Sequence, residues 1–481
     1  MALIGSKSVG MAGTLQTGRS GLAAAQAGIA NSGHNIANAN TEGFSRQRIS
    51  QTAEIDRGTG LSRVSPGAGA RISSVERVND RFVEKQIRNA NRDLAYAEEK
   101  GVILQQVEDV FNEMGGEGLN RLMSRFFNEF RKLSNEPESE AIRQSVREAS
   151  LAVVRDLKRL RGQVDQIMAH ADARLEGYVR EVQGLADEIA NLNTTIQTLE
   201  NSGGASNDLM DQRDLALKKL GSLVDVAMYT DTFGGYIVDI KGFGPLVVTG
   251  RAERLSTERT DANESGKHAN RMDVFLTNSS STPITDRLSG GRIGALIEAR
   301  DKTLSGAASK LDDIAFELAR AVNEVHRQGF TSNGGTQVDF FKEPVHRQGA
   351  AGVLALSDAV MESPHSIAAA AAPDSPGDNR IALALSNLQG LRMMSEGRST
   401  VDDFYNSIVS EVGVVANQNK TLFNQSKDVA AQLGKIREEI SGVSIDEETT
   451  KLMQYQHAFD ASARVIRVAD EMMKTVLSLK D

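Results

Sequence analysis

The chain contains no cysteine and no tryptophan among its 481 residues. The absence of cysteine excludes disulfide bonds, thiolate nucleophiles and zinc sites with cysteine ligands. A chain of this length without a single thiol suits a protein that folds outside the cell without help from a redox system. Its length is sufficient for two to four domains.

Proline is scarce, with 8 residues, and this favours a mainly helical chain because proline interrupts helices. No apolar run reaches the length of about 18 residues that a membrane helix requires, so we expect no membrane insertion. Acidic residues outnumber basic ones, 64 to 55, and the net charge of −9 disfavours nucleic acid as a partner. Residues 1–17 lack the apolar core and cleavage site of a conventional secretory signal.

The sequence also lacks the short motifs that carry catalytic chemistry. It has no His-Glu-x-x-His, Gly-x-Ser-x-Gly or Gly-Lys-Ser/Thr pattern, and its 7 histidines are scattered. Asp208, Asp211 and Asp214 stand at a predicted helix start, where we favour a capping and dipole role over a metal site. His457 is interpreted as a solvated or packing residue. We therefore expect a protein that is not an enzyme and that has no cofactor and no metal.

The most regular pattern lies at the C-terminus. Ser444 and Glu447 form a Ser-x-x-Glu capping box, which predicts a helix over residues 444–479. Apolar residues recur in it every seven positions, and the residues three positions further on are mostly small or polar. Such a seam lets helices approach closely but buries little alone, so it requires a partner helix. The bulky positions are Ile445, Leu452, Phe459, Ile466 and Met473.

The N-terminal segment has the same design. Its bulky residues are again seven apart, and Gly18, Ala25, Ser32 and Ala39 follow three positions after each of them. We expect the two ends to pair in one coil, to be poorly ordered in the free chain and to become ordered in an assembly. The alternative is an ordinary intramolecular helix pair at a domain edge. The predicted assembly interface is Leu15, Leu22, Ile29, Ile36, Ile445, Leu452, Tyr455, Phe459, Ile466 and Met473.

Between the ends, the pattern predicts a long helical stem with a β-rich insert. Apolar steps of three and four predict a rod over residues 137–199, capped by Asn135 and roughly 95 Å long if unbroken. Alternating apolar residues and turns predict an insert of strands over residues 227–288. The remaining expected elements are strands at 48–52 and 70–75, helices at 80–111, 211–220, 293–326, 381–394 and 401–440, a loop at 328–345 and a linker at 367–378.

The predicted fold class is therefore mainly α, with nested and discontinuous domains. The termini are innermost, the stem comes next, and the insert is farthest along the chain from both ends. The predicted domains are a terminal coiled-coil core of residues 1–50 with 441–481, a helical stem of 51–226 with 289–440, and one small outer β domain of 227–288.

Three motifs together resemble those of bacterial flagellar rod, hook and hook-associated proteins. The segment at residues 21–47, which ends in Ser45-Arg46-Gln47, looks most like the hook-associated protein 1 family of the hook–filament junction. Phe44 stands where members of that family commonly have tyrosine, and residues 1–20 form a longer start than is common. The other two motifs are Leu209-Met210-Asp211-Gln212-Arg213-Asp214 and the C-terminal run from Ser441 through Ile445, Tyr455 and Phe459 to Ile466.

This resemblance implies an axial protein that is secreted through the flagellar type III export channel. It implies self-assembly as one ring between the hook protein and the second hook-associated junction protein. It also implies that an export chaperone binds the C-terminal segment in the cytoplasm before export. In this family the terminal helices form the inner core, and β domains face outward.

Three alternatives remain open at this point. Within the axial proteins, the chain resembles rod, hook and second junction proteins less well, because rod and hook proteins commonly lack such a long helical stem. Outside that class, an extracellular adhesin or enzyme on a flagellar scaffold would need a functional cluster in residues 227–288, where none is evident. A cytosolic coiled-coil scaffold is the third alternative.

Overall fold

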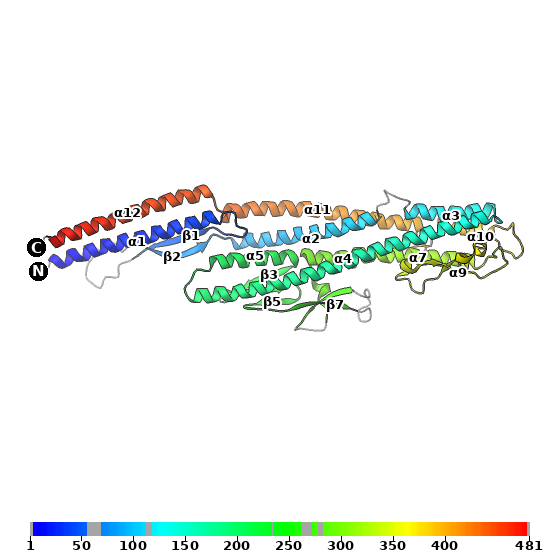
Figure 1. Cartoon of the computed structure of the whole chain (residues 1–481), viewed down its shortest axis with the longest axis horizontal. Coiled ribbons are helices and arrows are strands. Elements are labelled where there is room, and N and C mark those ends of the chain that lie inside the picture. The colour runs from blue at the N-terminus through cyan, green and yellow to red at the C-terminus, as the bar shows by residue number, and fades with distance from the viewer. Residues whose placement is uncertain are drawn as a thin grey trace.

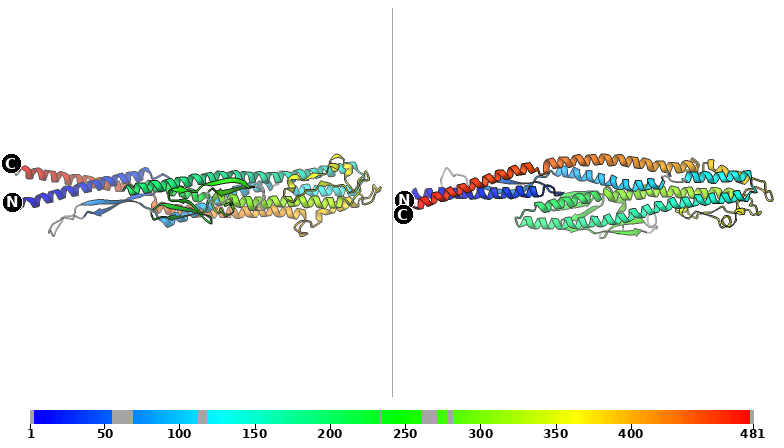
Figure 2. Two further views of the ribbon diagram at one scale, coloured as in Figure 1. Left: turned by 90° about the horizontal axis from the view of Figure 1, so that it is seen from below. Right: turned by 45° about the horizontal axis from the view of Figure 1, so that its top comes forward.

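The computed structural model describes residues 3–54, 69–111, 118–232, 234–260, 271–277 and 282–478. The molecule is a long, narrow bundle with both termini at one end (Figure 1). Two further views show the same arrangement, in which the two terminal helices project from a thicker stem (Figure 2). The mainly helical fold that the sequence predicts is confirmed.

Helices account for most of the described chain, and they include one long pair at the termini and several long stem helices. The helices are α1 (Leu3–Ala37), α2 (Arg81–Phe111), α3 (Leu119–Asn135), α4 (Glu140–Asn201), α5 (Asn207–Leu223), α6 (Gly291–Glu298), α7 (Ser305–His326), α8 (Ala350–Val353), α9 (Asp358–Glu362), α10 (Arg380–Asn387), α11 (Val401–Ser441) and α12 (Ile445–Ser478), with the shorter or irregular turns η1 (Thr285–Arg287), η2 (Ala299–Leu304), η3 (Pro364–Ser366) and η4 (Leu388–Gly390).

The strands form four small antiparallel sheets within the described residues. β1 pairs with β2 beside α1, and β9 pairs with β10 at the far end of the stem. The predicted insert contains a sheet in the order β3-β4-β5-β6 and a separate hairpin of β7 and β8. The strands are β1 (Gln47–Ala53), β2 (Ala70–Arg77), β3 (Val226–Thr230), β4 (Tyr236–Ile240), β5 (Gly244–Val248), β6 (Arg251–Ala252), β7 (Leu255–Thr260), β8 (Arg271–Leu276), β9 (Phe341–Lys342) and β10 (Ala355–Leu356).

The predicted rod corresponds to α4, a helix of 62 residues. Its start differs from the prediction, because the cap is Ser139, whose hydroxyl accepts a hydrogen bond from the Ile142 N–H at 3.4 Å. Asn135 instead ends α3, a helix that the sequence analysis did not anticipate. The apolar stripe of α4 runs along its whole length and is buried against α3, α5, α7 and the strands of the insert.

Two further predictions need correction. Residues 367–378 were expected to be a linker, but Ile367, Ala368 and Ala369 are buried to 0–1% exposure in the core. The helix expected over 381–394 ends earlier, at Asn387, and continues only as the single turn η4. The sequence also predicts a polar loop over residues 260–269 and a glycine turn at Gly115-Gly116, and these lie largely outside the described residues.

His326 explains why the supposed linker is packed. Its ring Nδ1 is 2.7 Å from the Val338 carbonyl, and its Nε2 accepts a hydrogen bond from the Ala368 N–H at 2.8 Å. The ring therefore holds the 328–345 loop and the 367–370 segment on the end of α7. Burial of the ring lowers the pKa of His326 from 6.5 to about 4, although the Val338 carbonyl favours the protonated form.

This depressed pKa predicts a specific pH dependence of stability. The unfolded chain binds more protons than the folded chain between pH 6.5 and about 4, so stability should fall as the pH falls through that window. The contribution of this single group reaches about 3 kcal/mol at most. His326→Gln should remove that part of the pH dependence when the free energy of unfolding is measured at pH 7 and pH 4.5.

His365→Gln is the matched control, because His365 lies in the same region with its side chain 41% exposed. This control should retain the pH dependence of the unaltered chain. Equal pH dependence in the His326 variant and the unaltered chain would contradict the prediction.

Candidate functional site: the terminal coil and its joint with the stem

The two terminal helices lie in close antiparallel contact. Gly18 faces Ile466, Gly21 faces Ser462 and Gly28 faces Tyr455. A Cβ atom at Gly28 would lie 2.5 Å from the Tyr455 ring, and one at Gly18 would lie 2.8 Å from Ile466 Cγ1. The glycine face of α1 is therefore what allows the larger side chains of α12 to approach its backbone.

The structure brings the predicted interface residues together on this coil but buries none of them fully. Ile445 and Met473 are exposed, at 53% and 36%, and the other eight are partly buried. Within residues 13–37 of α1, the fully buried residues are small, namely Gly18, Ala24, Ala25, Gly28 and Ser32, with Asn35.

A second apolar stripe follows another face of α12. It contains Val465, Val468, Met472 and Val476, which are spaced by three, four and four residues and are 41–52% exposed. Exposed apolar stripes of this kind mark contact surfaces more often than ordinary protein surface does. The coil therefore has one face buried within the chain and another apolar face that is open.

The end of the coil nearest the stem is fixed by a buried carboxylate. Glu448 is 1% exposed, and it accepts hydrogen bonds from Arg46 Nε at 2.9 Å and from the Asn35 amide at 3.1 Å. Lys451 also donates to it, at 3.2 Å. Burial works to raise the pKa of Glu448, but Asn35, Lys451 and Arg46 outweigh burial and lower the pKa. The carboxylate therefore remains charged and holds the start of α12 against α1 and β1.

Asn35 extends this network to the backbone of β1. Its amide donates to the Gln47 carbonyl at 2.9 Å, and its side-chain oxygen accepts from the Gln47 N–H at 3.0 Å. The Arg46 N–H donates to the Ser441 carbonyl at 3.0 Å, which links β1 to the end of α11. These contacts, which we call the joint, connect both terminal helices with the stem.

The acidic face of α5 completes the joint. Asp208 accepts from the Gln47 amide at 2.8 Å, and Asp211 accepts from the Ser45 N–H at 3.1 Å. Arg77 on β2 donates to Asp211 at 2.8 Å and to Asp214 at 2.9 Å. The three aspartates were expected to act in helix capping, but only Asp208 lies in the first turn. Asp208 and Asp211 thus anchor the end of the N-terminal motif to the stem, while Asp214 binds Arg77 of β2 and accepts from the Tyr236 hydroxyl at 2.7 Å.

Sequence analysis did not identify Asn35, Arg46, Gln47 and Glu448 as functional residues. One signal was available, because Glu448 occupies the small and polar row of α12, where a charged residue must find a partner if it is buried. Besides Lys451, its partners Arg46 and Asn35 lie 402 and 413 positions away in the sequence, so local patterns do not reveal them.

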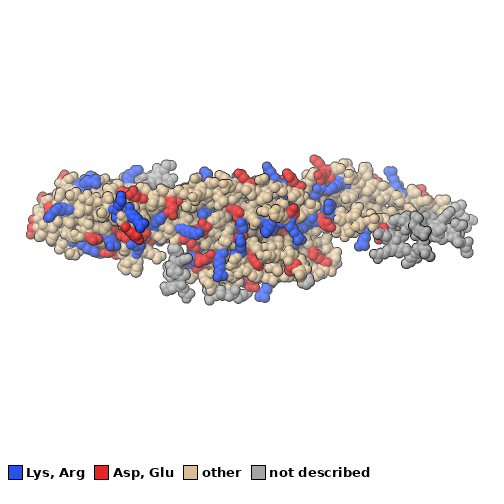
Figure 3. All heavy atoms as spheres, turned by 180° about the vertical axis from the view of Figure 1, so that it is seen from behind, with Lys and Arg blue, Asp and Glu red and all other residues tan. Residues whose placement is uncertain are grey.

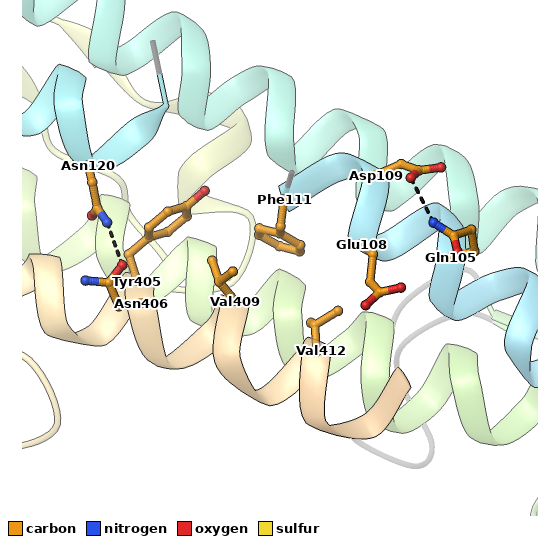
Figure 4. A pocket seen from close by; sticks show the side chains of 10 residues that line it. Gln105, Glu108, Asp109, Phe111, Asn120, Tyr405, Asn406, Val409 and Val412 are labelled. Atoms are coloured by element: carbon orange, nitrogen blue, oxygen red, sulfur yellow. Dashed lines mark hydrogen bonds between the residues drawn. The ribbon is translucent and has the colours of Figure 1, made fainter. Parts of the chain in front are cut away.

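The stem outside the joint carries grooves but no metal-binding cluster among its described residues. On the face in Figure 3, acidic and basic side chains are interspersed along the stem. Figure 4 shows a groove of about 500 Å³ where Phe111 at the end of α2 faces Tyr405 and Val409 on α11. No group of three or more potential metal-ligating side chains occurs among the described residues, nor do those residues include a helix fit to cross a membrane.

Comparison with known proteins identifies the class to which this architecture belongs. Residues 104–341 match the model of the flagellar hook-associated protein FlgK helical domain. Residues 437–479, which cover α12, match the model of the flagellar basal body rod FlgEFG protein C-terminal region. A coil built from both termini, joined to a long helical stem, is thus the structure of an axial protein of the bacterial flagellum.

The similarity extends over the whole chain. Flagellar hook-associated protein 1 of Bacillus subtilis (strain 168) is 30% identical over 493 aligned positions, covering 96% of this chain and 97% of that protein. The Escherichia coli (strain K12) protein of the same name is 25% identical, covering 98% and 100%. The structure of the flagellar hook junction protein FlgK from Burkholderia pseudomallei has the same fold, with a TM-score of 0.64 over 75% of this chain and all of that chain at 16% identity. The chain belongs to the flagellar hook-associated protein 1 family, whose members are structural proteins of the hook–filament junction.

The glycine contact predicts opposite effects for two similar substitutions in α1. Gly33→Ala adds a Cβ that meets nothing within 4 Å, so it should stabilise the helix by about 0.5–1 kcal/mol. Gly28→Ala forces Tyr455 to move, and we expect a net loss of about 1–2 kcal/mol because overpacking outweighs helix propensity. Hydrogen exchange of the α1 amides should show less protection for Gly28→Ala and more for Gly33→Ala. Equal effects would contradict the packing shown here.

The joint predicts unequal roles for two adjacent carboxylates that both bind Arg46. Glu448→Gln removes a buried charge from a network of three donors, and we expect a loss of about 1–3 kcal/mol in the opening free energy of the first turns of α12. Glu447 is the control, because its side chain is 61% exposed and its Arg46 contact is worth at most about 1 kcal/mol. Native-state hydrogen exchange measures both values. A larger effect for Glu447→Gln would refute the assignment.

Proposed function

We propose that this chain polymerises as a ring between hook and filament and that the ring is needed for filament attachment. Its neighbours along the flagellar axis are then the hook protein on one side and the second hook-associated junction protein on the other. The family supports a place in the flagellum and association with other axial proteins. The ring and its particular partners are our proposal.

The observation that carries this proposal is the incomplete burial of the terminal coil. α1 and α12 cover only one face of each other: Val465 lies beside Gly18 at the edge of that contact, and Val468, Met472 and Val476 remain 44–52% exposed. A small-residue seam contributes little stability, since a buried CH₂ group is worth about 0.8 kcal/mol. We infer that the coil is loosely ordered in the free chain and gains its remaining contacts from neighbouring copies.

The same coil supports a proposal about export. We propose that the chain is secreted through the flagellar type III channel after a transient cytoplasmic stage, during which an export chaperone covers part of α12. The exposed apolar residues of α12 would need such protection before assembly. A chain with no cysteine can also unfold for transport and refold without disulfide exchange.

We further propose that the nested parts have separate roles. Residues 1–50 with 441–481 form the assembly core, residues 51–226 with 289–440 form the stem, and residues 227–288 form an outer β domain. The joint supports a division between core and stem, because it concentrates the contacts of Asn35, Arg46 and Glu448 at that border. The two sheets of the insert pack on the side of α4, which supports an outward position (Figure 1).

We propose that the chain is not an enzyme. Its family is structural, and the polar side chains at the joint bind one another. An adhesin or enzyme carried on a flagellar scaffold would instead be expected to present a functional cluster in the insert. Polar side chains of the stem instead pack against the insert, since the Asn193 amide of α4 donates to the Tyr236 and Thr249 carbonyls and Arg213 of α5 stacks on the Tyr236 ring at 3.6 Å.

The proposal predicts that charge on the open stripe blocks assembly without unfolding the chain. Cells that lack the protein should carry hooks without filaments and shed flagellin into the medium. Val468→Asp should reproduce this phenotype, because Val468 is 52% exposed and a buried aspartate in the assembled coil would lack a partner. Electron microscopy of cell surfaces measures the fraction of hooks with filaments.

Arg467→Asp is the control, since it places the same carboxylate one residue away, outside the apolar stripe. Circular dichroism of the purified variants should be unchanged, because the stem does not involve either residue. Normal filaments with Val468→Asp would show that the stripe is not an assembly surface. Normal filaments in the deletion strain would refute the proposed function itself.

A further inference from the structure

A basic groove lies on the stem close to the joint. It has a volume of about 500 Å³ and is lined by the first three turns of α2, by β3 and by Lys241 after β4. Five of its lining side chains are cations, and Asp225 is the one carboxylate. Asp225 accepts from Arg92 at 2.7 Å and lies 3.2 Å from Lys241. The other three cations, Arg81, Lys85 and Arg88, have no ion-pair partner among the described residues.

Tyr229 lines the groove from β3, and a second exposed aromatic residue, Phe82, follows the lining residue Arg81 on α2. Phe82 on α2 is 68% exposed and Tyr229 on β3 is 57% exposed. Aromatic residues and arginine are enriched at protein interfaces, and they dominate the residues that contribute most to binding. The groove therefore combines a positive charge with exposed aromatic surface, which suits a protein segment that is both acidic and apolar.

Such a segment occurs elsewhere on this chain, at the bend between α11 and α12. We call residues 438–446 the elbow. Ile440 and Ile445 are 36% and 53% exposed there. Glu438, Glu439 and Asp446 are exposed and form no ion pair within the described residues, while the nearby Arg437 and Arg46 are engaged with Glu84 and with Glu447 and Glu448. The elbow lies on the outside of the molecule where the two helices change direction (Figures 1 and 2).

The elbow does not occupy the groove of its own chain, because no residue of α11 or α12 lines that groove. α11 instead contacts α2 at this level through Arg437 and Glu84, at 2.8 Å. A second copy of the chain is therefore the occupant that can satisfy both surfaces. A contact between two different patches of identical chains repeats around an axis and closes into a ring if the rotation allows.

We propose that the elbow of one copy docks in the basic groove of the next copy around the ring. This inference rests on the proposed ring function and adds a contact at the level of the stem to the contacts of the terminal coil. Ile440 and Ile445 then cover Phe82 and Tyr229, and the carboxylates of the elbow face Arg81, Lys85 and Arg88. The attraction also selects the direction of the contact, because groove against groove or elbow against elbow would bring like charges together.

Because the chain has no cysteine, engineered thiols test this contact without background. A chain carrying both Lys85→Cys and Glu439→Cys is expressed in cells that lack the natural protein, and isolated flagella are treated with a mild oxidant. Disulfides form only where Cα atoms come within about 7 Å of each other. We expect a ladder of covalent dimers, trimers and larger oligomers on non-reducing gels, which a reductant abolishes.

The matched pair is Lys85→Cys with Glu188→Cys, which tests the other acidic surface of the stem. Glu181, Asp187 and Glu188 are exposed on α4 and could offer charge without the apolar residues of the elbow. A ladder from the Lys85 and Glu188 pair, with none from the Lys85 and Glu439 pair, would overturn the proposal. Absence of any ladder from flagella that contain the double variant would overturn it as well.

A charge exchange gives a second, independent readout in the absence of thiols. Lys85→Glu and Glu439→Lys should each lower the fraction of hooks with filaments by about threefold or more, since like charges then meet in the interface. The two changes together should restore at least half of the filaments. Additive losses would contradict the contact. Failure of the proposed function is distinguished by the unaltered chain, which would then be absent from isolated flagella or dispensable for filaments.

Discussion

The contact on which the rest of this structure depends is the approach of α12 to the glycine face of α1. Tyr455 and Ile466 reach the backbone of α1 only because Gly28 and Gly18 carry no side chain. This contact brings together residues from the two ends of the chain and therefore makes the fold a nested one. The stem and the insert lie between the two helices in the sequence, so the chain must pass from the coil into the stem and back into the coil at the same end of the coil.

The joint holds the two chain connections between the coil and the stem together. A buried carboxylate on α12, an asparagine on α1 and the backbone of β1 satisfy one another's hydrogen bonds, and the aspartates of α5 hold the same segment from the stem side. Removal of any one partner leaves a buried polar group without a bond, which costs more than the bond itself contributes. Such a network keeps the coil at a defined angle to the stem, and an axial assembly needs that angle to be the same in every copy.

The stem and the terminal coil differ in how much of their apolar surface is buried within one chain. The stem buries a continuous core, from the phenylalanines of α3 to the long stripe of α4. The coil leaves the stripe of α12 open, and the region near the joint leaves Phe82, Tyr229, Ile440 and Ile445 exposed. The stem buries its core within one chain, whereas the exposed residues of the coil and the elbow gain burial from other copies in the ring that we propose.

The sequence by itself determined the periodic elements of this protein. The heptads of the two ends, the long α4 stripe and the strand-like insert follow from spacing alone, because side chains on one face of a helix or strand must meet one environment. The sequence motifs also determined the family. Only the tertiary structure decided which polar residues form the joint, that Ser139 caps α4, and that His326 packs the supposed linker of residues 367–370. The contacts of the joint and of His326 join residues that are far apart in the chain, so they depend on the folded geometry, which no local pattern specifies; the cap is a local contact between Ser139 and Ile142.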